Sequence, residues 1–451
     1  MKRLSYILGL GLLLVVNSVF AQESITIAKA REMALEYNKT LKVADLQRME
    51  AGANQKQART AYLPMIDASG TAMFLPQLDN VEIPGFHLPT ADNSGNITGM
   101  SDVYFPGVNI ETERLQLYQA QLDMQIPIYA GGRIRYANKM ADKGVEIAEE
   151  AYQLETEQVV LNTDKVYWQL VALKENLKVA NKYVTMLDSL ESQLKVMYDI
   201  GLVPKSEQLK VSVQKNEAEL NLMRAANAYQ LVQMNLCQTI GLPLNSAVEV
   251  DDDLNENPEM LSLADALNKA MDSRSELHIL GKQVEINDYR KKSVSAEYRP
   301  SLGAQVSYGY THVPNLITDQ FMTTASAQLS IPIVHWGEKK HKMDAARYQV
   351  QQSQLKLDET REFVQMEVQQ YMLQLSEAYE SIFLAKKGKL EAEENLEEVK
   401  LSYEAGLNTT TDLLNAQASW QKAQAGLLEA LANYEIAKTT YYKGIGQLAI
   451  N

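Results

Sequence analysis

Apolar residues recur at helical spacing over one very long stretch in the second half of the chain. No proline occurs between Gly337 and Gly444, and apolar positions repeat every three or four residues on both sides of the segment 404–410. We predict a helical hairpin that turns at Gly406. At about 1.5 Å per residue its ascending arm, from Gly337 to Ala405, would be about 100 Å long, far beyond the usual helix of a globular protein.

Four shorter segments alternate apolar with polar residues and therefore predict strands with one apolar and one polar face. They lie at residues 68–74, 120–126, 302–310 and 325–331. Each strand would have about ten residues, the length of a tilted membrane strand. A soluble hairpin with one wet face is the alternative for any single segment. We expect outside loops at residues 76–109, rich in Pro, Gly, Asn and Asp, and at residues 312–321.

The chain is an internal duplication, because short matches recur at offsets of 236 and then 205 residues. The matches are Ile25–Ala30 with Leu261–Ala266, Ala61–Pro64 with Glu297–Pro300, Gln125–Ile128 with Ser330–Ile333, Gly201–Leu202 with Gly406–Leu407, and Ile240–Gly241 with Ile445–Gly446. The fall of 31 residues between the offsets places an insertion in the first half.

Three segments follow from these patterns. Residues 1–21 are predicted to be a secretory signal peptide, because Lys2 and Arg3 precede a short apolar run and a Val19-Phe20-Ala21 cleavage pattern. Residues 22–250 and 251–451 are the predicted repeats. Each has a helix (25–61 or 263–296), a β-hairpin (about 63–128 or 300–333) and a long helical hairpin, with its tip near 201–204 or 406–409.

Composition and motifs argue against several classes of function. The formal net charge of −14 argues against a nucleic-acid partner. Cys237 is the only cysteine, which excludes an intramolecular disulfide and predicts a small core residue. His335 and His341 are six residues apart, a poor spacing for a metal site on one helical face. No motif supports an enzyme.

Four strands cannot close a barrel, and open strand edges are not tolerated in lipid, so other copies of the chain must supply the missing partners. Two copies would give eight strands and three would give twelve. Only the larger barrel leaves a wide lumen, because side chains just fill an eight-stranded interior. We therefore expect three or more copies.

The element order, the duplication, the Ile-Pro-Ile strand ends and the tips Gly201-Leu202-Val203-Pro204 and Gly406-Leu407 together resemble the TolC-type outer-membrane efflux protein family. The resemblance implies a mainly α fold with a transmembrane β-barrel: a homotrimer with four strands per copy, twelve in all, continued by helical hairpins as a periplasmic α-barrel. It implies the outer membrane of a Gram-negative-type envelope, with a periplasmic adaptor and an inner-membrane pump of the RND or ABC type as partners. No cofactor is implied.

The resemblance also assigns roles to single residues. Asp412 would form a ring of carboxylates at a periplasmic gate, and Tyr403 and Glu207 would help to close it. Asn415 stands where a second acidic residue can occur, and Asn408 where some relatives have an arginine. The alternatives are that Tyr403 is a core residue and that Asp412 and Glu207 favour helix N-termini electrostatically.

The two tips and two aromatic residues complete the expected sites. Gly201 and Gly406 would adopt positive φ at the reversals. An apolar rim for an adaptor would be formed by Leu202, Val203, Pro204 and Leu407. Tyr129 and Trp336 would belong to an aromatic girdle at the membrane interface, unless they only begin the helical core.

The sequence thus predicts an exit duct for small toxic molecules. The alternatives are a duct for polypeptides in type I secretion and a structural coiled-coil protein of the envelope that forms no pore.

Overall fold

The computed structural model describes residues 23–75, 81–92, 95–110, 115–261, 264–314 and 317–448, so the expected signal peptide lies outside it. The chain divides into two compact units. One holds the described residues up to Gly52, Lys143–Val284 and the chain from Gln351 onward, and the other holds Ala53–Asp142 and Glu285–Val350. Each unit therefore draws on both halves of the sequence.

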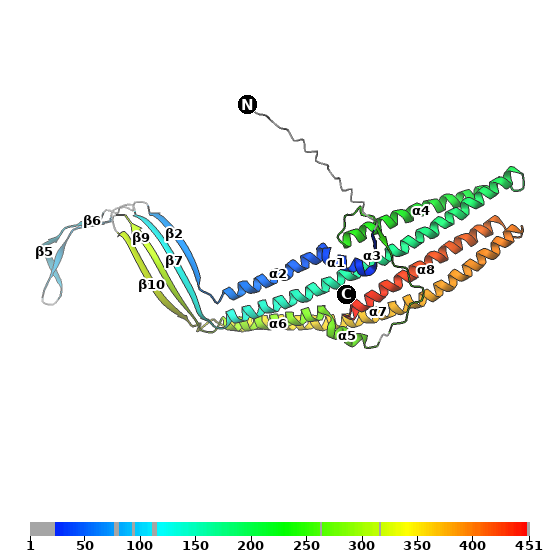
Figure 1. The fold of residues 1–451 in the computed structure, drawn as a ribbon. Coiled ribbons are helices and arrows are strands. Elements are labelled where there is room, and N and C mark those ends of the chain that lie inside the picture. Colours follow the sequence, from blue (N-terminus) through cyan, green and yellow to red (C-terminus); the bar gives the residue numbers. More distant parts are fainter. Residues whose placement is uncertain are drawn as a thin grey trace, which may run out of the picture. The chain divides into compact units, whose positions relative to one another are not determined.

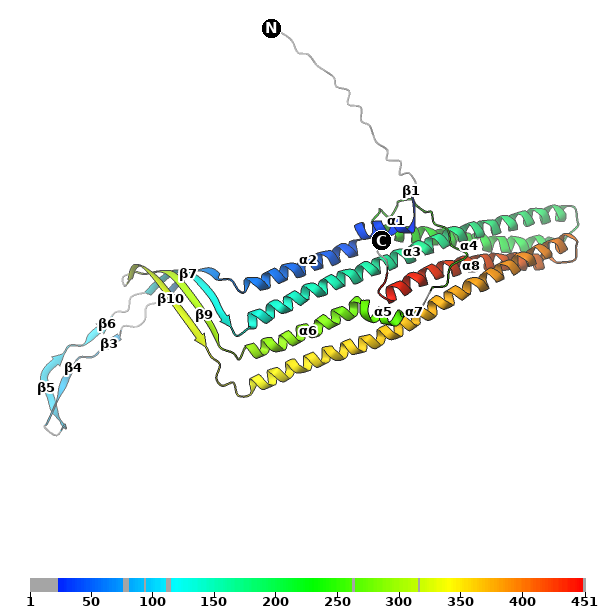
Figure 2. The same cartoon turned by 60° about the horizontal axis from the view of Figure 1, so that its bottom comes forward.

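Long helices dominate the structure. The helices are α1 (Ile27–Tyr37), α2 (Lys39–Thr60), α3 (Arg133–Asp199), α4 (Lys205–Thr239), α5 (Ala266–Ser273), α6 (Ser275–Ala296), α7 (Glu338–Glu404) and α8 (Thr410–Gly444). Helices α3 and α4 form one antiparallel hairpin, and α7 and α8 form a second beside it (Figures 1 and 2). The predicted long hairpin is confirmed, since α7 has 67 residues and α8 has 35.

The single helices predicted at residues 25–61 and 263–296 are wrong in detail, because each is broken in two. Asn38 ends α1 and starts α2: its side-chain oxygen accepts hydrogen bonds from the amides of Thr40 and Leu41, at 2.9 and 3.3 Å. An asparagine that caps a helix in this way starts a new helix. In the second half, Arg274 has extended backbone angles and separates α5 from α6. Leu263 lies outside the described residues.

Each of the two helix breaks is tied by a side-chain hydrogen bond to the end of the last helix in its half of the chain. The Asn38 amide donates to the carbonyl of Thr239, the last residue of α4, at 2.9 Å. The Arg274 guanidinium donates to the carbonyl of Gly444, the last residue of α8, at 3.1 Å. Asn38 and Arg274 are 236 residues apart, and Thr239 and Gly444 are 205 apart. The offsets found in the sequence thus recur as equivalent contacts.

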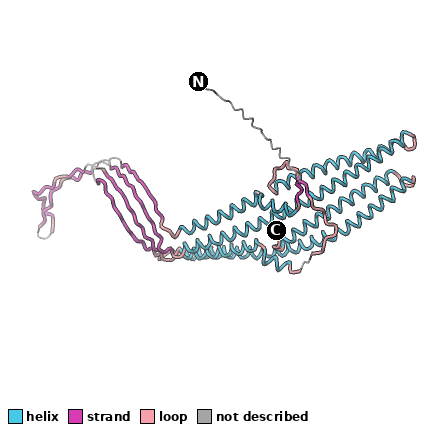
Figure 3. The backbone as a smooth tube through the Cα atoms, viewed as in Figure 1, coloured by secondary structure: helices cyan, strands magenta, loops and turns pink. Residues whose placement is uncertain are grey.

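The four predicted long strands form one antiparallel sheet (Figure 3). They are β2 (Met65–Leu75), β7 (Leu115–Ala130), β9 (Ser301–Val313) and β10 (Ile317–Ser330), in the order β10-β9-β7-β2. With 11 to 16 residues, they are longer than the predicted ten. The loop expected at 312–321 is accordingly wrong: the strands continue into it, and Phe321 packs on Tyr310 across the pair.

The register gives the sheet two different faces. One level of the apolar face aligns Ile66, Met124, Val306 and Ala325 across the four strands. The next level, on the polar face, aligns Asp67, Asp123, Ser307 and Thr324. Within the described residues the outer edges of β2 and β10 pair with no further strand.

Short strands occupy places where none was predicted. Strand β1 (Glu23–Ile25) pairs in parallel with β8 (Val248–Val250). The insertion expected to be a loop at 76–109 contains strands instead, where it is described; Pro76 is not. There β3 (Val81–Ile83) pairs with β6 (Val108–Ile110), and β4 (Phe86–Ala91) pairs with β5 (Ile97–Phe105).

Three hydrophobic clusters hold the helices. The first contains Tyr167, Leu170 and the buried thiol of Cys237, and the second contains Val368 and Tyr434. The third lies between the two hairpins and contains Leu194, Leu413 and Trp420. Among the described residues, no helix is both long enough and apolar enough to cross a bilayer.

Candidate functional site

The two hairpin tips have the same backbone turn. Gly201 and Gly406 have φ of 78° and 76°, which confirms the predicted positive φ. The amide of Leu202 bonds to the carbonyl of Met197, and the amide of Leu407 bonds to that of Ser402, each at 2.8 Å. The amides of Gly201 and Gly406 bond to the carbonyls of Tyr198 and Tyr403, at 2.9 and 3.0 Å. Together these bonds form Schellman motifs, which end a helix on a left-handed residue. The tips are therefore fixed turns of defined shape.

The apolar rim is narrower than expected. Leu202 and Leu407 are 70% and 80% exposed. Pro204 is exposed and precedes α4 as its N-cap, without a side-chain cap bond. Val203 is half-buried and packs against the cluster between the hairpins, so it is less exposed than expected. The packing of Val203 keeps the first tip attached to its own core.

Asp412 caps α8. Its carboxylate accepts from the Thr409 amide at 2.9 Å and from the Thr409 hydroxyl at 2.6 Å, and its own amide donates to that hydroxyl at 3.2 Å. This is a reciprocal capping box. The hydroxyl and amide of Thr409 hold the pKa of Asp412 below its ordinary value. The carboxylate is exposed and ionised at neutral pH.

Glu207 connects the N-termini of two helices. It accepts from Lys210 of its own helix α4 at 2.8 Å. Hydrogen bonds from Lys210 and then from Thr410 of α8 lower its pKa. The first hairpin is thereby linked to the second beside the capping box of Asp412.

Above the tips, a hollow of about 600 Å³ lies between α3 and the α7–α8 hairpin. We call it the tip groove. Tyr403 lines it and also packs against the third hydrophobic cluster. Gln417 lines it too, and its side-chain carbonyl is buried without a hydrogen-bond partner among the described residues. Sequence reasoning missed Gln417, because a glutamine on a long helix carries no signal of burial.

An exposed stripe runs along α8 from the capping box. Asp412, Asn415, Ser419 and Lys422 are all exposed at spacings of three and four residues, so they share one helical face. Asn408, in the preceding turn, is half-buried. The stripe carries one carboxylate and, three turns later, one ammonium group. Sequence reasoning named Asp412 and Asn415 but not Lys422, which the helical spacing alone could have indicated.

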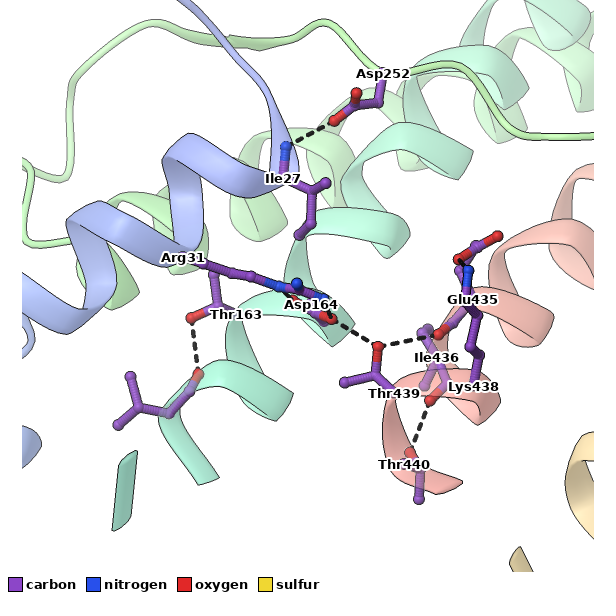
Figure 4. A network of polar contacts seen from close by, with 11 residues as sticks. Ile27, Arg31, Thr163, Asp164, Asp252, Glu435, Ile436, Lys438, Thr439 and Thr440 are labelled. Atoms are coloured by element: carbon purple, nitrogen blue, oxygen red, sulfur yellow. Dashed lines mark hydrogen bonds and ion pairs between the residues drawn. The ribbon is translucent and has the colours of Figure 1, made fainter. Parts of the chain in front are cut away.

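A buried polar network joins helices α1, α3 and α8 (Figure 4). Its residues are far from the two hairpin tips in sequence. Asp164 of α3 is fully buried, and Arg31 of α1 donates to both of its oxygens, at 2.7 and 2.6 Å. Thr439 of α8 donates to the same carboxylate at 2.6 Å. Sequence reasoning missed this set because 133 and 275 residues separate the partners.

The two expected interface aromatics lie where strands pass into helices. Tyr129 is 51% exposed and Trp336 is 95% exposed, so neither belongs to a helical core within this chain. Trp336 has φ of 44°, and at the equivalent place in the first half the chain has Gly131, with φ of 65°. A bulky residue rarely adopts this conformation. The described residues contain no group of His, Cys, Asp and Glu able to hold a metal ion.

Comparisons with known proteins show which family has this sequence pattern and this fold. A sequence model for outer membrane efflux proteins matches residues 30–242 and 266–447. No curated protein matches the chain in sequence. The fold is similar to the Campylobacter jejuni CmeC outer membrane channel, with a TM-score of 0.75, 16% identity, and 93% of this chain and 85% of that one covered.

Two further solved structures share the fold. The outer membrane protein VceC of Vibrio cholerae gives a TM-score of 0.71 at 15% identity, with 93% of this chain and 96% of that one covered. The open state of the Neisseria gonorrhoeae MtrE outer membrane channel gives 0.72 at 16%, with coverage of 94% and 90%. The family match spans both halves of the sequence, and the fold matches span nearly all of it. The chain belongs to the outer membrane efflux protein family, of the TolC type, and is a non-enzymatic channel protein of the outer membrane.

Proposed function

We propose that three copies of this chain form an exit duct of a tripartite efflux system, which passively conducts small toxic molecules across the outer membrane. The four-stranded sheet carries the proposal. Its two open edges need partner strands in lipid, and three copies supply twelve strands, enough for an aqueous lumen. The apolar face then meets lipid and the polar face lines the lumen.

The polar face suits a water-filled lumen. Asp123 accepts hydrogen bonds from Ser307 at 2.6 Å, from Gln121 at 2.7 Å and from Gln305 at 3.1 Å. These groups satisfy the carboxylate while leaving the face hydrophilic. On the opposite face, Ile66 and Leu329 are 67% and 60% exposed, as lipid-facing side chains of an isolated copy must be.

The tips serve as the gate and as the docking point for a periplasmic adaptor, which connects the duct to an inner-membrane pump of the RND or ABC type. Leu202 and Leu407 offer apolar contacts on rigid turns. Asp412 supplies one carboxylate per copy, and Asn415 no second one, so the gate selects cations less strongly than a double ring would.

Single-channel recording in planar bilayers tests the duct. Purified trimers are expected to give discrete conductance steps. Well-folded trimers without any steps would contradict both ducts and favour the structural envelope protein. Asp412→Asn is expected to raise the closed-state conductance and to weaken its preference for cations, whereas Asn415→Ala, on the same stripe, leaves both unchanged. Unchanged conductance and selectivity in Asp412→Asn would reduce Asp412 to a helix cap. An RND pump among co-purifying partners supports drug efflux, and an ABC transporter supports type I secretion.

We propose that Trp336 and Tyr129 anchor the junction of strands and helices at the membrane interface. Trp336 is suited to a direct test, because the other two tryptophans, Trp168 and Trp420, are buried. Brominated lipids are expected to quench the fluorescence of the wild type strongly and that of Trp336→Phe weakly. Equal quenching of the two proteins would remove Trp336 from the lipid interface.

A further inference from the structure

The contact of Asp164 with Thr439 joins the two halves of the chain. Arg31 and Asp164 both belong to the first half, and their paired hydrogen bonds tie α1 to α3. Thr439 belongs to the second half, and its hydroxyl is the group that brings α8 to this carboxylate (Figure 4). We call these three residues the Asp164 joint.

The carboxylate of the joint is buried and its oxygens are satisfied. Asp164 has no exposed side-chain area and Thr439 is 5% exposed, while the Arg31 side chain is 24% exposed and, with Thr439, lines a hollow of about 330 Å³. Three donor groups share the two carboxylate oxygens, and hydrogen bonding to Asp164 raises the pKa of Arg31 although burial opposes the shift. A buried carboxylate with this set of donors is costly to disturb, because any lost partner leaves an unpaired group in a low-dielectric interior.

The same hairpins meet at the tips through weaker contacts. There the third hydrophobic cluster is interrupted by the tip groove, and the Gln417 carbonyl is buried without a partner among the described residues. Glu207, which links α4 to α8, is also paired with Lys210 at the surface. Separating the hairpins here hydrates a polar group that is unsatisfied in the closed arrangement, so opening costs less at the tips than at the joint.

We propose that the Asp164 joint is a fixed pivot: when the channel opens, the α7–α8 hairpin swings away from the α3–α4 hairpin at the tips while α8 stays attached to α3 through Thr439. This inference rests on the proposed duct function. Thr439 is a positioning residue, since it acts on the tips through the helix that carries it. In the wild type the separation of the hairpins ends at the joint. Loss of the Thr439 hydroxyl lowers the cost of conformations in which the joint itself has parted, so these open conformations become more populated relative to the closed state.

Closed-state leak of trimers in planar bilayers tests the pivot. Thr439→Val keeps the shape of the side chain and removes the one hydroxyl that α8 contributes to Asp164. Loss of a buried hydrogen bond of ordinary strength raises the population of conformations in which the joint has parted by about fivefold, so leak through these conformations should rise by about that factor. Thr439→Ser restores the hydroxyl and should restore the wild-type leak.

Thr440→Val is the matched control. The hydroxyl of Thr440 donates to the carbonyl of Ile436 in its own helix at 2.7 Å, so its loss removes no contact between the halves. Wild-type leak in Thr439→Val trimers, or an equal rise in Thr440→Val trimers, would overturn the pivot. Channels that conduct with an adaptor but show no effect of Thr439→Val reject the pivot alone, whereas an absence of channels in every variant, including wild type, rejects the duct.

A second measurement leaves the joint intact and so does not depend on the folding of the variant. Spin labels are placed at exposed positions, Asn162 beside the joint or Leu407 at the tip, in separate proteins. Addition of the cognate adaptor is expected to change the distances between copies at Leu407 and to leave those at Asn162 unchanged. Equal changes at both positions would overturn a fixed pivot.

Discussion

The Asp164 joint and the two tips are built on the same long helices, yet they hold those helices together by different means. At the joint, a carboxylate of one helix is enclosed by donors from two others. At the tips, an apolar cluster borders a hollow and encloses a carbonyl without a partner. The difference shows how a helical hairpin can be firm along part of its length and ready to separate at its end without any break in the helices.

The largest expected effect comes from removing the carboxylate of the joint. Asp164→Ala leaves the Arg31 guanidinium without its partner, and breaking a buried pair in this way costs about 3–5 kcal/mol. Thermal unfolding in detergent, followed by circular dichroism, measures the loss. Asp188→Ala on the same helix is the control: Asp188 pairs with Lys215 at 2.5 Å but is 60% exposed, and such surface pairs contribute about 0–1 kcal/mol. Equal losses of stability in the two variants would show that the joint stabilises the fold no more than an exposed ion pair does.

Two leucines of α3 sharpen the comparison. Leu170 lies in the first hydrophobic cluster and Leu194 in the third, and both are fully buried. Substitution of a buried leucine by alanine costs about 2–5 kcal/mol, less where the surroundings can collapse. Neighbours of Leu194 can relax toward the tip groove, so Leu194→Ala is expected to cost less than Leu170→Ala in the same thermal unfolding experiment. The reverse order would mean that the tips are packed as tightly as the joint.

Periodicity made much of this fold predictable. The helical pattern gave α7 and α8, the period of two gave the four long strands, and Gly201 and Gly406 marked the turns because only a left-handed residue ends a helix in this way. The helix breaks at Asn38 and Arg274 were not predicted. Apolar periodicity continues across them, and only the side-chain contacts of Asn38 and Arg274 with α4 and α8 show why the chain bends there.

The residues of the candidate site were likewise predictable only where local sequence defines them. Residues defined by local sequence, such as Asp412 beside Thr409, could be named in advance together with the alternative of a helix cap, and the cap is present. Whether Asp412 also gates the channel stays a prediction. The Asp164 joint, the burial of Gln417 and the packing of Val203 depend on contacts between distant segments. A single sequence contains no record of such contacts.

At the tips, a substitution of Gln417 is expected to stabilise the protein, unlike the destabilising changes above. Gln417→Leu replaces a buried amide whose carbonyl has no partner by an apolar side chain of similar volume, and it should stabilise the closed tip by about 1 kcal/mol. We expect higher thermal stability and a lower closed-state leak. Gln424→Leu, on the same helix, is the control, because Gln424 donates to Glu393 and loses a real contact. A destabilised Gln417→Leu variant would show that a partner outside this chain satisfies the amide.

The smallest effect concerns Glu157, a buried carboxyl group close to Asp164 in sequence. It lies seven residues before Asp164 on the same face of α3 and is 6% exposed. Burial, and then the charge of Glu276, raise its pKa above the ordinary 4.5, although Lys443 and Arg274 oppose the shift. The fold therefore favours the protonated form, and the stability that this form contributes is lost as pH rises through the raised pKa.

Glu157→Gln keeps the side chain neutral at every pH. At pH 7 the variant should be slightly more stable than wild type, and the advantage should shrink as pH falls toward 4.5, where the wild-type carboxyl also becomes neutral. Thermal unfolding at a series of pH values measures the difference, with the exposed Glu149→Gln on the same helix as control. An advantage that grows as pH falls would reverse the assigned sign. It would mean that Lys443 and Arg274 stabilise an ionised Glu157, making it a working part of the joint like Asp164.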